Sequence, residues 1–490
     1  METHRTILLA AALAAFAAPA AAQECNCPET FEFVTTTIRE NYSGWRDKVT
    51  PRTQPALDSL TARVRARAQA ARTDLECAQV MQEWIAFFRD GHVGVGYQPP
   101  RQAGAADESD DQVRARFASA PSMDLDEARA RAYLDANEGR LAPVEGIWEG
   151  VGSPYRVAIV RAPDAPAEFR AVVLRADSVW WMPRQVKATF TEAGADGYAS
   201  RFYMRDHSEQ GMEARVNRNF LLFSGGFAWA RTYPARADDV APQAYTQTLN
   251  RELRIRRLSD RTLLIQVPTM NHQYAAALDS LVQAHRQEIL RTPNLIVDVR
   301  GNGGGSDYTY APLLPLLYTD SIRSPGVSIL STPRNIRNFE EILEDTTFPE
   351  SQKPPVRRLV EALRARPGQL VDRGGSARGF DTVFPMPRRV GVLMNSGCAS
   401  SCEQFVLAAR DSRKTTLFGG RTGGVLDYAN VAQVATTCPR MTARWATSRS
   451  NRLPHDPVDP DGIAPQVAVP ADEIFPLEWV RRWMESRDGA

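Results

Sequence analysis

The sequence predicts an α/β core, preceded by a helical region and by an inserted β-rich domain. Three observations carry this prediction. From about residue 251 onward, short apolar strands alternate with helical patterns, which is typical of a mainly parallel sheet with crossover helices. Closely spaced alternating runs fill residues 141–235, and apolar residues recur at helical spacing between residues 29 and 90.

Length and composition bound the possible function. With 490 residues the chain exceeds one ordinary core, so two or three domains are expected. The 43% hydrophobic and 24% charged residues are typical of a globular protein. The formal net charge of +1 gives no electrostatic reason to expect nucleic acid or an anionic membrane as a partner. No cofactor is predicted.

The first 22 residues have the pattern of a secretory signal peptide. A basic residue precedes an apolar run of about a dozen residues, which closes with an A-x-A end. The run is too short to span a bilayer as a stable helix. We therefore expect residues 1–22 to be removed, and the mature protein to be periplasmic or secreted without stable membrane insertion.

Export makes disulfides the expected state of the cysteines. The six are Cys25, Cys27, Cys77, Cys398, Cys402 and Cys438. Either of the first two is expected to pair with the third, which joins two N-terminal helices, and some pairing is expected among the last three. Because the spacing lacks two paired C-x-x-C units, no zinc or other metal site is predicted.

Residues 23–100 are the expected N-terminal helical region. Its second helix ends in the glycines of Asp90-Gly-His92 and the residues that follow. Residues 101–250 comprise a small, polar connector and the β-rich domain. Regular turn signals between its short runs predict an antiparallel barrel or sandwich.

Residues 251–490 are the expected α/β domain. Its predicted strands are Thr262–Val267, Asn294–Val299, Val390–Met394 and Thr415–Phe418, and its clearest helices are Tyr274–Leu290 and Leu477–Glu485. Residues 331–380 are rich in Pro and Gly, which predicts an excursion from this core.

Ser400 follows an apolar strand and a turn of small residues, and a helix begins near it. A hydroxyl at a helix N-terminus lies among unpaired N–H groups that favour negative charge, which suits a nucleophile. The alternative is purely structural. Ser400-Ser-Cys-Glu403 fits the S-x-x-E capping box, in which the serine only caps the helix.

Two further loops carry polar chemistry. His92 sits between glycines at a helix end, where a general base is exposed yet held; the alternative is a cation that stabilises the helix C-terminus. Gly301–Gly305 is glycine-rich but fits neither a phosphate loop nor a dinucleotide fingerprint. Its N–H groups suit an oxyanion hole, and a plain tight turn is the alternative.

These motifs resemble those of the tail-specific, or C-terminal-processing, serine proteases. Leu295–Gly305 resembles their D-x-R-x-N-x-G-G element, and Ser400–Phe405 resembles their S-A-S-E element, whose first serine is the nucleophile. Asp461-Gly-Ile-Ala-Pro465 resembles their D-G-I-x-P element. The resemblance spans about residues 255 to 470. It implies that the α/β domain is a spiral of parallel strands and helices of the ClpP/crotonase type.

One departure from this pattern redirects the search for a base. The tail-specific members place a lysine just past a glycine about 25 residues after the serine, but here Val425 follows Gly424, and Lys414 falls in another element. The chain is instead similar to the tricorn-type branch of the family, in which a histidine from an N-terminal D-G-H or S-H motif is the base. That similarity implies His92.

The same resemblance implies the remaining site residues. The acid of the branch maps to Asp459, with Asp461 as its close competitor. The oxyanion donors would be the N–H groups of Ser401 and of Gly303 or Gly304. A peptide-binding PDZ domain is not recognisable, and the β-rich domain occupies its place.

The function expected from the sequence is that of an exported serine endopeptidase. It would hydrolyse peptides or unfolded proteins through a Ser-His-Asp triad and an acyl-enzyme. The alternative is a non-catalytic or weakly catalytic protein that binds a ligand or peptide on the same scaffold. An esterase is disfavoured because Ser400 lacks the G-x-S-x-G elbow.

Overall fold

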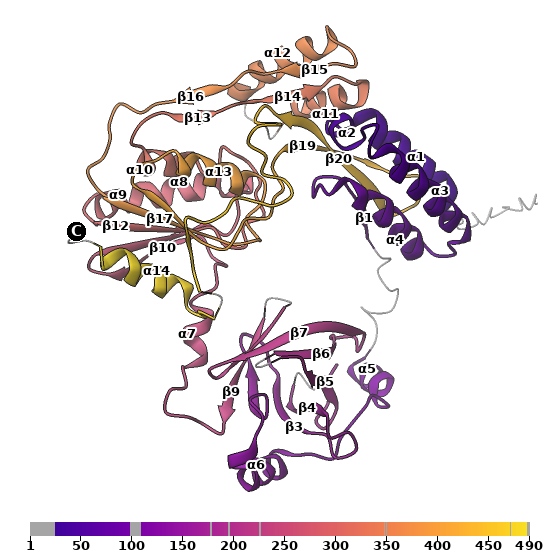
Figure 1. The fold of residues 1–490 in the computed structure, drawn as a ribbon, viewed down its shortest axis with the longest axis vertical. Helices are drawn as coiled ribbons and strands as arrows, with labels where there is room; N and C mark the ends of the chain where they lie inside the picture. Colours follow the sequence, from indigo (N-terminus) through magenta and orange to yellow (C-terminus); the bar gives the residue numbers. More distant parts are fainter. Residues whose placement is uncertain are drawn as a thin grey trace, which may run out of the picture. The chain divides into compact units, whose positions relative to one another are not determined.

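The computed structural model describes residues 25–98, 109–176, 179–194, 197–224, 227–346, 348, 350–470 and 472–487 (Figure 1). The predicted signal peptide, residues 1–22, and residues 101–108 of the predicted connector lie outside them. The chain divides into two compact units. The first comprises residues 1–99, 328–372 and 428–449, and the second comprises residues 100–327, 373–427 and 450–490.

The first unit packs helices with a five-stranded sheet. The helices are α1 (Cys27–Asn41), α2 (Trp45–Lys48), α3 (Gln54–Ala70), α4 (Asp74–Ile85), η1 (Ala86–Phe88), α11 (Pro333–Glu344), η5 (Glu350–Gln352) and α12 (Lys353–Arg364). The strands run in the order β1 (Gly94–Tyr97), β20 (Met441–Ser450), β14 (Val327–Leu330) and β15 (Leu370–Asp372), and β19 (Tyr428–Ala435) also pairs with β20.

Buried polar contacts join the three separate chain segments of this unit, residues 1–99, 328–372 and 428–449. Asn335 on α11 donates to the backbone oxygen of Asn41 at 2.9 Å and accepts from the Trp445 indole N–H at 2.8 Å. All three residues are buried, so each hydrogen bond satisfies a group that water does not reach. Residues 331–372 of the predicted excursion are therefore part of the same unit as the N-terminal helices, and residues 373–380 belong to the second unit.

The β-rich domain is a closed barrel of antiparallel strands, which confirms the prediction. Its strands are β2 (Gly146–Gly150), β3 (Arg156–Arg161), β4 (Glu168–Arg175), β5 (Val186–Glu192), β6 (Gly197–Tyr203), β7 (Glu209–Asn217), β8 (Phe220–Phe223) and β9 (Ala228–Tyr233). Aromatic side chains such as Trp148, Phe169 and Phe190 are buried in one apolar cluster. Three short elements flank the barrel: α5 (Asp110–Phe117), α6 (Glu127–Ala136) and η2 (Glu138–Arg140).

The core of the second unit is a six-stranded sheet with the order β10-β11-β12-β17-β18-β21. These strands are Arg254–Ser259, Thr262–Gln266, Asn294–Asp298, Arg389–Met394, Thr415–Gly419 and Val467–Ala468. All pairs from β11 onward are parallel, as predicted. Because strand order follows chain order, right-handed crossovers all advance in one direction and place their helices on one face.

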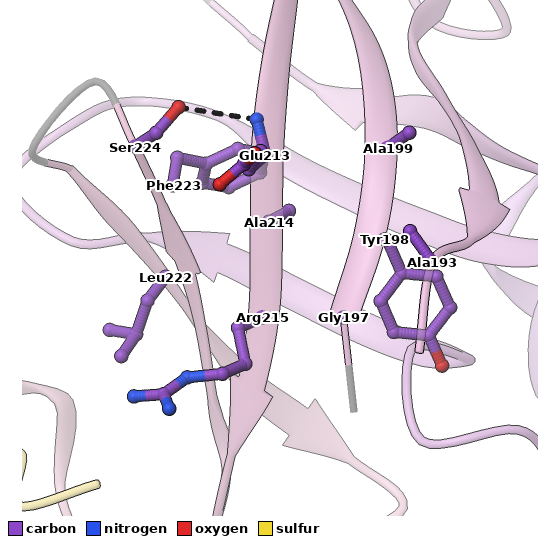
Figure 2. A pocket seen from close by; sticks show the side chains of 10 residues that line it. All are labelled: Ala193, Gly197, Tyr198, Ala199, Glu213, Ala214, Arg215, Leu222, Phe223 and Ser224. Atoms are coloured by element: carbon purple, nitrogen blue, oxygen red, sulfur yellow. Dashed lines mark hydrogen bonds between the residues drawn. The ribbon is translucent and has the colours of Figure 1, made fainter. Parts of the chain in front are cut away.

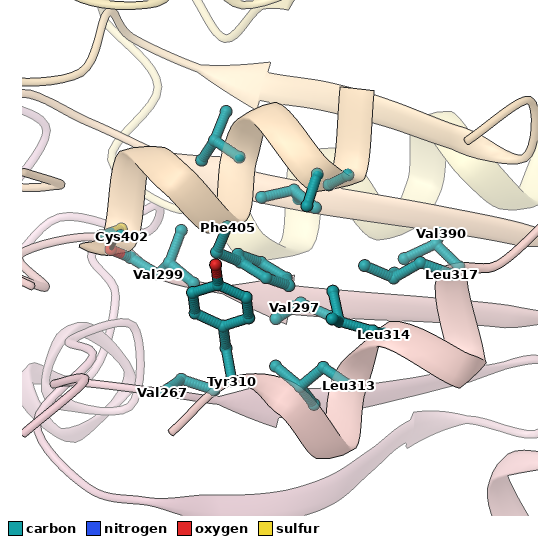
Figure 3. Packing of buried hydrophobic residues seen from close by; sticks show 14 of the residues in the cluster. Val267, Val297, Val299, Tyr310, Leu313, Leu314, Leu317, Val390, Cys402 and Phe405 are labelled. Atoms are coloured by element: carbon teal, nitrogen blue, oxygen red, sulfur yellow. Dashed lines mark hydrogen bonds between the residues drawn. The ribbon is translucent and has the colours of Figure 1, made fainter. Parts of the chain in front are cut away.

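The two faces of this sheet have different partners, because successive side chains of a strand point to opposite faces. One cluster packs β-strand residues such as Val297 and Val392 against α8 (Ala275–Ala284), α10 (Leu314–Leu317) and α13 (Ser401–Arg410). Figure 3 shows Phe405 and Cys402 of α13 in this cluster with Val297. On the other face, α14 (Pro476–Glu485) packs against Leu264, Ile296, Leu393 and Phe418.

The remaining elements of the second unit are short. They are α7 (Pro242–Thr246), η3 (His272–Tyr274), α9 (Arg286–Ile289), η4 (Ala311–Leu313), and the two-stranded ribbon of β13 (Ile322–Ser324) and β16 (Ser376–Arg378). The predicted helix Tyr274–Leu290 is thus divided into α8 and α9, with His285 between them.

Candidate active site

Two loops leave the sheet at the carboxyl ends of the neighbouring parallel strands β12 and β17. The glycine loop (Gly301–Gly305) follows β12, and the turn that ends at Ser400 (Asn395–Ser400, the Ser400 turn) follows β17. They are tied together where Gly301 donates its N–H to Asn395 Oδ1 at 2.9 Å, and where Ala399 donates to the backbone oxygen of Asn302 at 3.1 Å. The sheet therefore places the predicted nucleophile beside the predicted oxyanion loop.

Ser400 adopts a strained backbone conformation directly before α13, with φ 57° and ψ −122°. Non-glycine residues rarely take a positive φ, and such strain concentrates at active sites and sharp nucleophile turns. The Ser400 N–H is shared between the backbone oxygen of Val425 at 3.0 Å and Glu403 Oε2 at 3.1 Å. These contacts hold the turn in its strained form.

Glu403 anchors this turn from within the protein. Its fully buried carboxylate also accepts hydrogen bonds from the Thr422 hydroxyl at 2.6 Å and from the N–H groups of Gly424 and Val425 at 2.8 and 2.9 Å. A buried carboxylate requires such partners. The glutamate of the capping-box sequence thus links α13 to residues 422–425, a role that the sequence pattern alone did not reveal.

The glycine loop approaches Ser400 closely at Gly304, whose φ is +94°. A Cβ at this position would lie 2.8 Å from Ser400 Cβ and 3.0 Å from the Ser401 nitrogen. Ser401 begins α13, where backbone N–H groups lack helical partners. A glycine therefore keeps open the space beside the Ser401 N–H.

The two predicted glycine donors differ. The Gly304 N–H donates to Asn302 Oδ1 at 3.0 Å, whereas the Gly303 N–H makes no hydrogen bond to the described residues. Asn302 is fully buried and donates to the backbone oxygen of Val267 at 2.9 Å. Asn302 thus fixes the conformation of the glycine loop. It is the asparagine of the D-x-R-x-N-x-G-G element, so the sequence motif could have identified it as a site residue.

Asp459 belongs to the same network as the Ser400 turn. Its Oδ1 accepts from the N–H groups of Leu426 at 2.6 Å and Asp427 at 3.0 Å. In return, Asp427 Oδ2 accepts from the N–H groups of Val458 and Asp459 at 2.7 and 2.9 Å. This reciprocal clamp fixes the Asp459 carboxylate, whereas Asp461 is exposed.

His92 belongs to the first unit, in the turn between η1 and β1. Its N–H donates to Asp90 Oδ1 at 2.8 Å, and its ring Nδ1 lies 3.9 Å from the same oxygen. Asp90 Oδ2 accepts from the Tyr42 hydroxyl at 2.7 Å. Burial raises the pKa of Asp90, and its hydrogen bonds and the nearby charges of His92 and Lys48 oppose that rise.

Lys414 lies at the wrong edge of the sheet for a catalytic base. It precedes β18, which runs parallel to β17, whereas Ser400 follows the carboxyl end of β17. A strand of this length separates the two edges by roughly 17 Å. Burial lowers the pKa of Lys414 to about 8, but its ammonium donates to the backbone oxygen of Phe384 at 3.4 Å.

The cysteines form three disulfides: Cys25–Cys438, Cys27–Cys77 and Cys398–Cys402. The second matches the expected pairing of an N-terminal cysteine with Cys77, and the third lies within the expected C-terminal set. Cys438 pairs outside that set, because the turn after β19 belongs to the same unit as α1. The described residues contain no free cysteine.

Residues 261–469 match the sequence profile of Peptidase family S41. This region of the chain is a peptidase family S41 domain. Members of this family are serine peptidases, so the fold and the motif-bearing loops belong to a serine peptidase. No curated protein matches the chain in sequence.

The chain is similar to several solved structures. The crystal structure of mature CPAF is 14% identical with a TM-score of 0.50, and the match covers 95% of this chain and 98% of that one. Mature CPAF complexed with lactacystin is also 14% identical, with a TM-score of 0.49 and coverages of 94% and 98%. A putative peptidase from Parabacteroides merdae is 14% identical, with a TM-score of 0.42 and coverages of 95% and 99%.

Recesses lie both in the barrel and in the α/β core. A recess of about 510 Å³ lies in the barrel, lined by residues of β6, β7 and β8 (Figure 2). There Ser224 Oγ accepts from the Glu213 N–H at 3.2 Å. It contains no predicted site residue. A second recess, of about 400 Å³, is lined in part by α13, the helix that begins at the Ser400 turn.

Among the described residues, no helix is long and apolar enough to cross a membrane.

Proposed function

We propose that this S41 peptidase is an exported endopeptidase that cleaves peptides or unfolded proteins with Ser400 as its nucleophile. The observation that carries the proposal is the strained Ser400 backbone at the start of α13, packed against Gly304. Neither feature is needed for a serine that only caps a helix, because capping residues normally have β-region dihedrals.

His92 acts as the general base in this proposal. It takes the proton of the Ser400 hydroxyl as the oxygen attacks the scissile carbonyl, and it returns that proton to the leaving amine. Asp459 orients and balances the imidazolium. The support for Asp459 is the clamp with Asp427, in which the N–H groups of Leu426 and Asp427, directly after the Ser400 partner Val425, fix the Asp459 carboxylate.

The N–H groups of Ser401 and Gly303 stabilise the oxyanion. Gly303 is preferred to Gly304 because the N–H of Gly304 already donates to Asn302. Each such donor is worth about 2.7–4 kcal/mol of transition-state stabilisation. Water then hydrolyses the acyl-enzyme, with the same histidine as base.

Hydrolysis of an unfolded protein and of a peptide blocked at both ends tests this function. An endopeptidase cleaves the internal bonds of the blocked peptide, whereas an exopeptidase does not. We expect Ser400→Ala and His92→Ala to lower kcat/KM by at least about 10²-fold, and Ser396→Ala, an exposed serine in the same turn, to retain activity. Binding of the peptide without any turnover by the wild type would instead indicate a non-catalytic scaffold.

The choice of acid has its own test. Asp459→Asn is expected to lower kcat by about 10²-fold or more, and Asp461→Asn, at an exposed position, by less than about three-fold. A larger loss for Asp461→Asn would transfer the role to that residue.

Export is tested by the mature N-terminus. When the full chain is produced in a bacterial host with a periplasm, the proposal expects N-terminal sequencing of the periplasmic fraction to begin at Gln23. Retention of Met1 in the cytoplasm would contradict it.

A further inference from the structure

The recess beside α13 lies close to the nucleophile along the helix. Gln404 and Ala408 line it, and they follow Ser400 by about one and two helical turns, or roughly 6 and 12 Å along the axis. An extended peptide advances roughly 3.3 Å per residue. A peptide held at Ser400 would therefore bring a side chain from within about two residues of the scissile bond to this recess.

The β13–β16 ribbon also lines the recess. Ile322 pairs with Arg378, and Ser324 pairs with Ser376, so these four side chains share one face of the ribbon. All four line the recess. The ribbon therefore presents Arg378 to the same space that α13 borders.

Arg378 is an exposed residue of the recess, which Asp307 also lines. It makes no ion pair with the described residues, in contrast to the buried pair of Arg452 with Asp427 at 2.8 Å. Its guanidinium lies over the Phe380 ring, 5.3 Å from the centroid. A stacked guanidinium is held in place with its fork of N–H donors open to a ligand.

Tyr310 and Asp307 add a phenol and a carboxyl to the lining of the recess, and Leu314 adds an apolar side chain. Tyr310 is buried, and burial followed by the charge of Asp307 raises the pKa of its phenol, which remains a hydrogen-bond donor. Asp307 itself is accessible to solvent, yet desolvation by the surrounding protein raises the pKa of its carboxyl. Leu314 lines the apolar side.

We propose that this space, the Arg378 recess, binds an acidic side chain of the substrate, best a glutamate, within two residues of the scissile bond. The methylene stem contacts Leu314, and the carboxylate accepts from Arg378, with Gln404 as a second donor. This assignment rests on the proposed peptidase function and adds its substrate preference.

The test uses the full-length mature protein and pairs of blocked peptides that differ only by Glu or Gln, placed in turn at each of the three positions on either side of the cleaved bond. At one position within two residues of the bond, the wild type is expected to favour Glu in kcat/KM by about five-fold, as for a partly exposed ion pair. Arg378→Gln should bring that ratio to about one, Arg378→Glu should reverse it, and Arg378→Lys should keep most of it. Arg413→Gln removes an exposed arginine outside the recess and should leave the ratio unchanged.

Two results overturn the assignment while the peptidase function stands: turnover without a Glu preference at any tested position, or a preference that Arg378→Gln leaves intact. Failure of every peptide to be cleaved, together with failure of Ser400 to be acylated, defeats the peptidase function and the recess assignment together.

Discussion

At the scale of single residues, the site depends on backbone positions that few amino acids tolerate. Ser400 has a positive φ, and Gly304 has both a positive φ and no space for a side chain. Glu403, Asn302 and the Asp427–Asp459 clamp fix these positions with hydrogen bonds to backbone groups. In the proposed mechanism these contacts position Ser400 and the oxyanion donors before substrate arrives, which is the condition for effective oxyanion stabilisation.

Gly304→Ala is expected to lower kcat by about 10²-fold or more, with a smaller change in KM, because the methyl group fills the space beside the Ser401 N–H. Steady-state kinetics measure this. Gly420→Ala is the matched control, since a Cβ at Gly420 meets no atom within 4 Å. Equal activity of the two variants would show that the space beside Ser401 is not the oxyanion hole.

At the scale of elements, the start of α13 is braced on both sides of Ser400. The buried Cys398–Cys402 disulfide connects the turn to the first turn of the helix, and Glu403 connects the helix to residues 422–425. The parallel pairing of β12 and β17 brings the glycine loop to the same edge. The geometry of the proposed nucleophile is thus a property of the strand–turn–helix element.

The double variant Cys398→Ala/Cys402→Ala is expected to lower kcat by about ten-fold or more, because a small displacement of a reacting group is costly. Its circular dichroism should remain that of the wild type, since α13 is also packed through Phe405 and Val406. Unchanged kcat in the folded double variant would show that Glu403 alone suffices to hold the turn.

Lys414→Met is expected to raise the free energy of unfolding at pH 7 by about 1 kcal/mol, because the partly buried ammonium is charged at a desolvation cost. Its folded pKa of about 8 lies below the ordinary 10.5, so the unfolded state binds the proton more tightly between these values. The free energy of unfolding of the wild type therefore rises between pH 8 and 10.5, as Lys414 loses its proton. The difference in unfolding free energy between the variant and the wild type shrinks over the same range. Urea titrations at pH 7 and 10.5 measure the difference, and peptide hydrolysis should be unchanged; lost hydrolysis would point to a Ser-Lys mechanism.

At the scale of the whole molecule, segments far apart in sequence form one unit. Cys25 and Cys438 are separated by 413 residues and are joined by a disulfide. Removing them as Cys25→Ala/Cys438→Ala is expected to lower stability by roughly 2–5 kcal/mol, because a very long loop of the unfolded chain is released. Differential scanning calorimetry of oxidised protein measures this. A midpoint equal to that of the wild type would show that this bridge contributes nothing to the first unit.

Much of the architecture follows from local patterns. The apolar runs at Thr262, Asn294, Val390 and Thr415 each become a core strand, and the regular turn signals of residues 141–235 become the barrel. Periodicity reports which face of an element is buried, and buried faces assemble in few ways.

The rest depends on contacts between distant segments, which no local pattern encodes. The pairing of β1 with β20, the hydrogen bond of Asn335 to Asn41 and the Cys25–Cys438 bridge are of this kind. In the candidate active site, the sequence motifs alone identified Ser400 as a candidate nucleophile and the glycine loop as a candidate oxyanion hole. The anchoring contacts of Glu403, and the hydrogen bond that occupies the Gly304 N–H, required the fold.

The most direct test of the central claim is the mass-spectrometric location of a fluorophosphonate adduct on the mature protein. Such a probe phosphonylates an activated serine: the serine oxygen attacks phosphorus, as it attacks the carbonyl carbon in peptide hydrolysis, and fluoride leaves. The account predicts one adduct on Ser400, absent in Ser400→Ala and formed at least about 10²-fold more slowly in His92→Ala. An adduct on another serine, or labelling of Ser400 at an unchanged rate without His92, would contradict it.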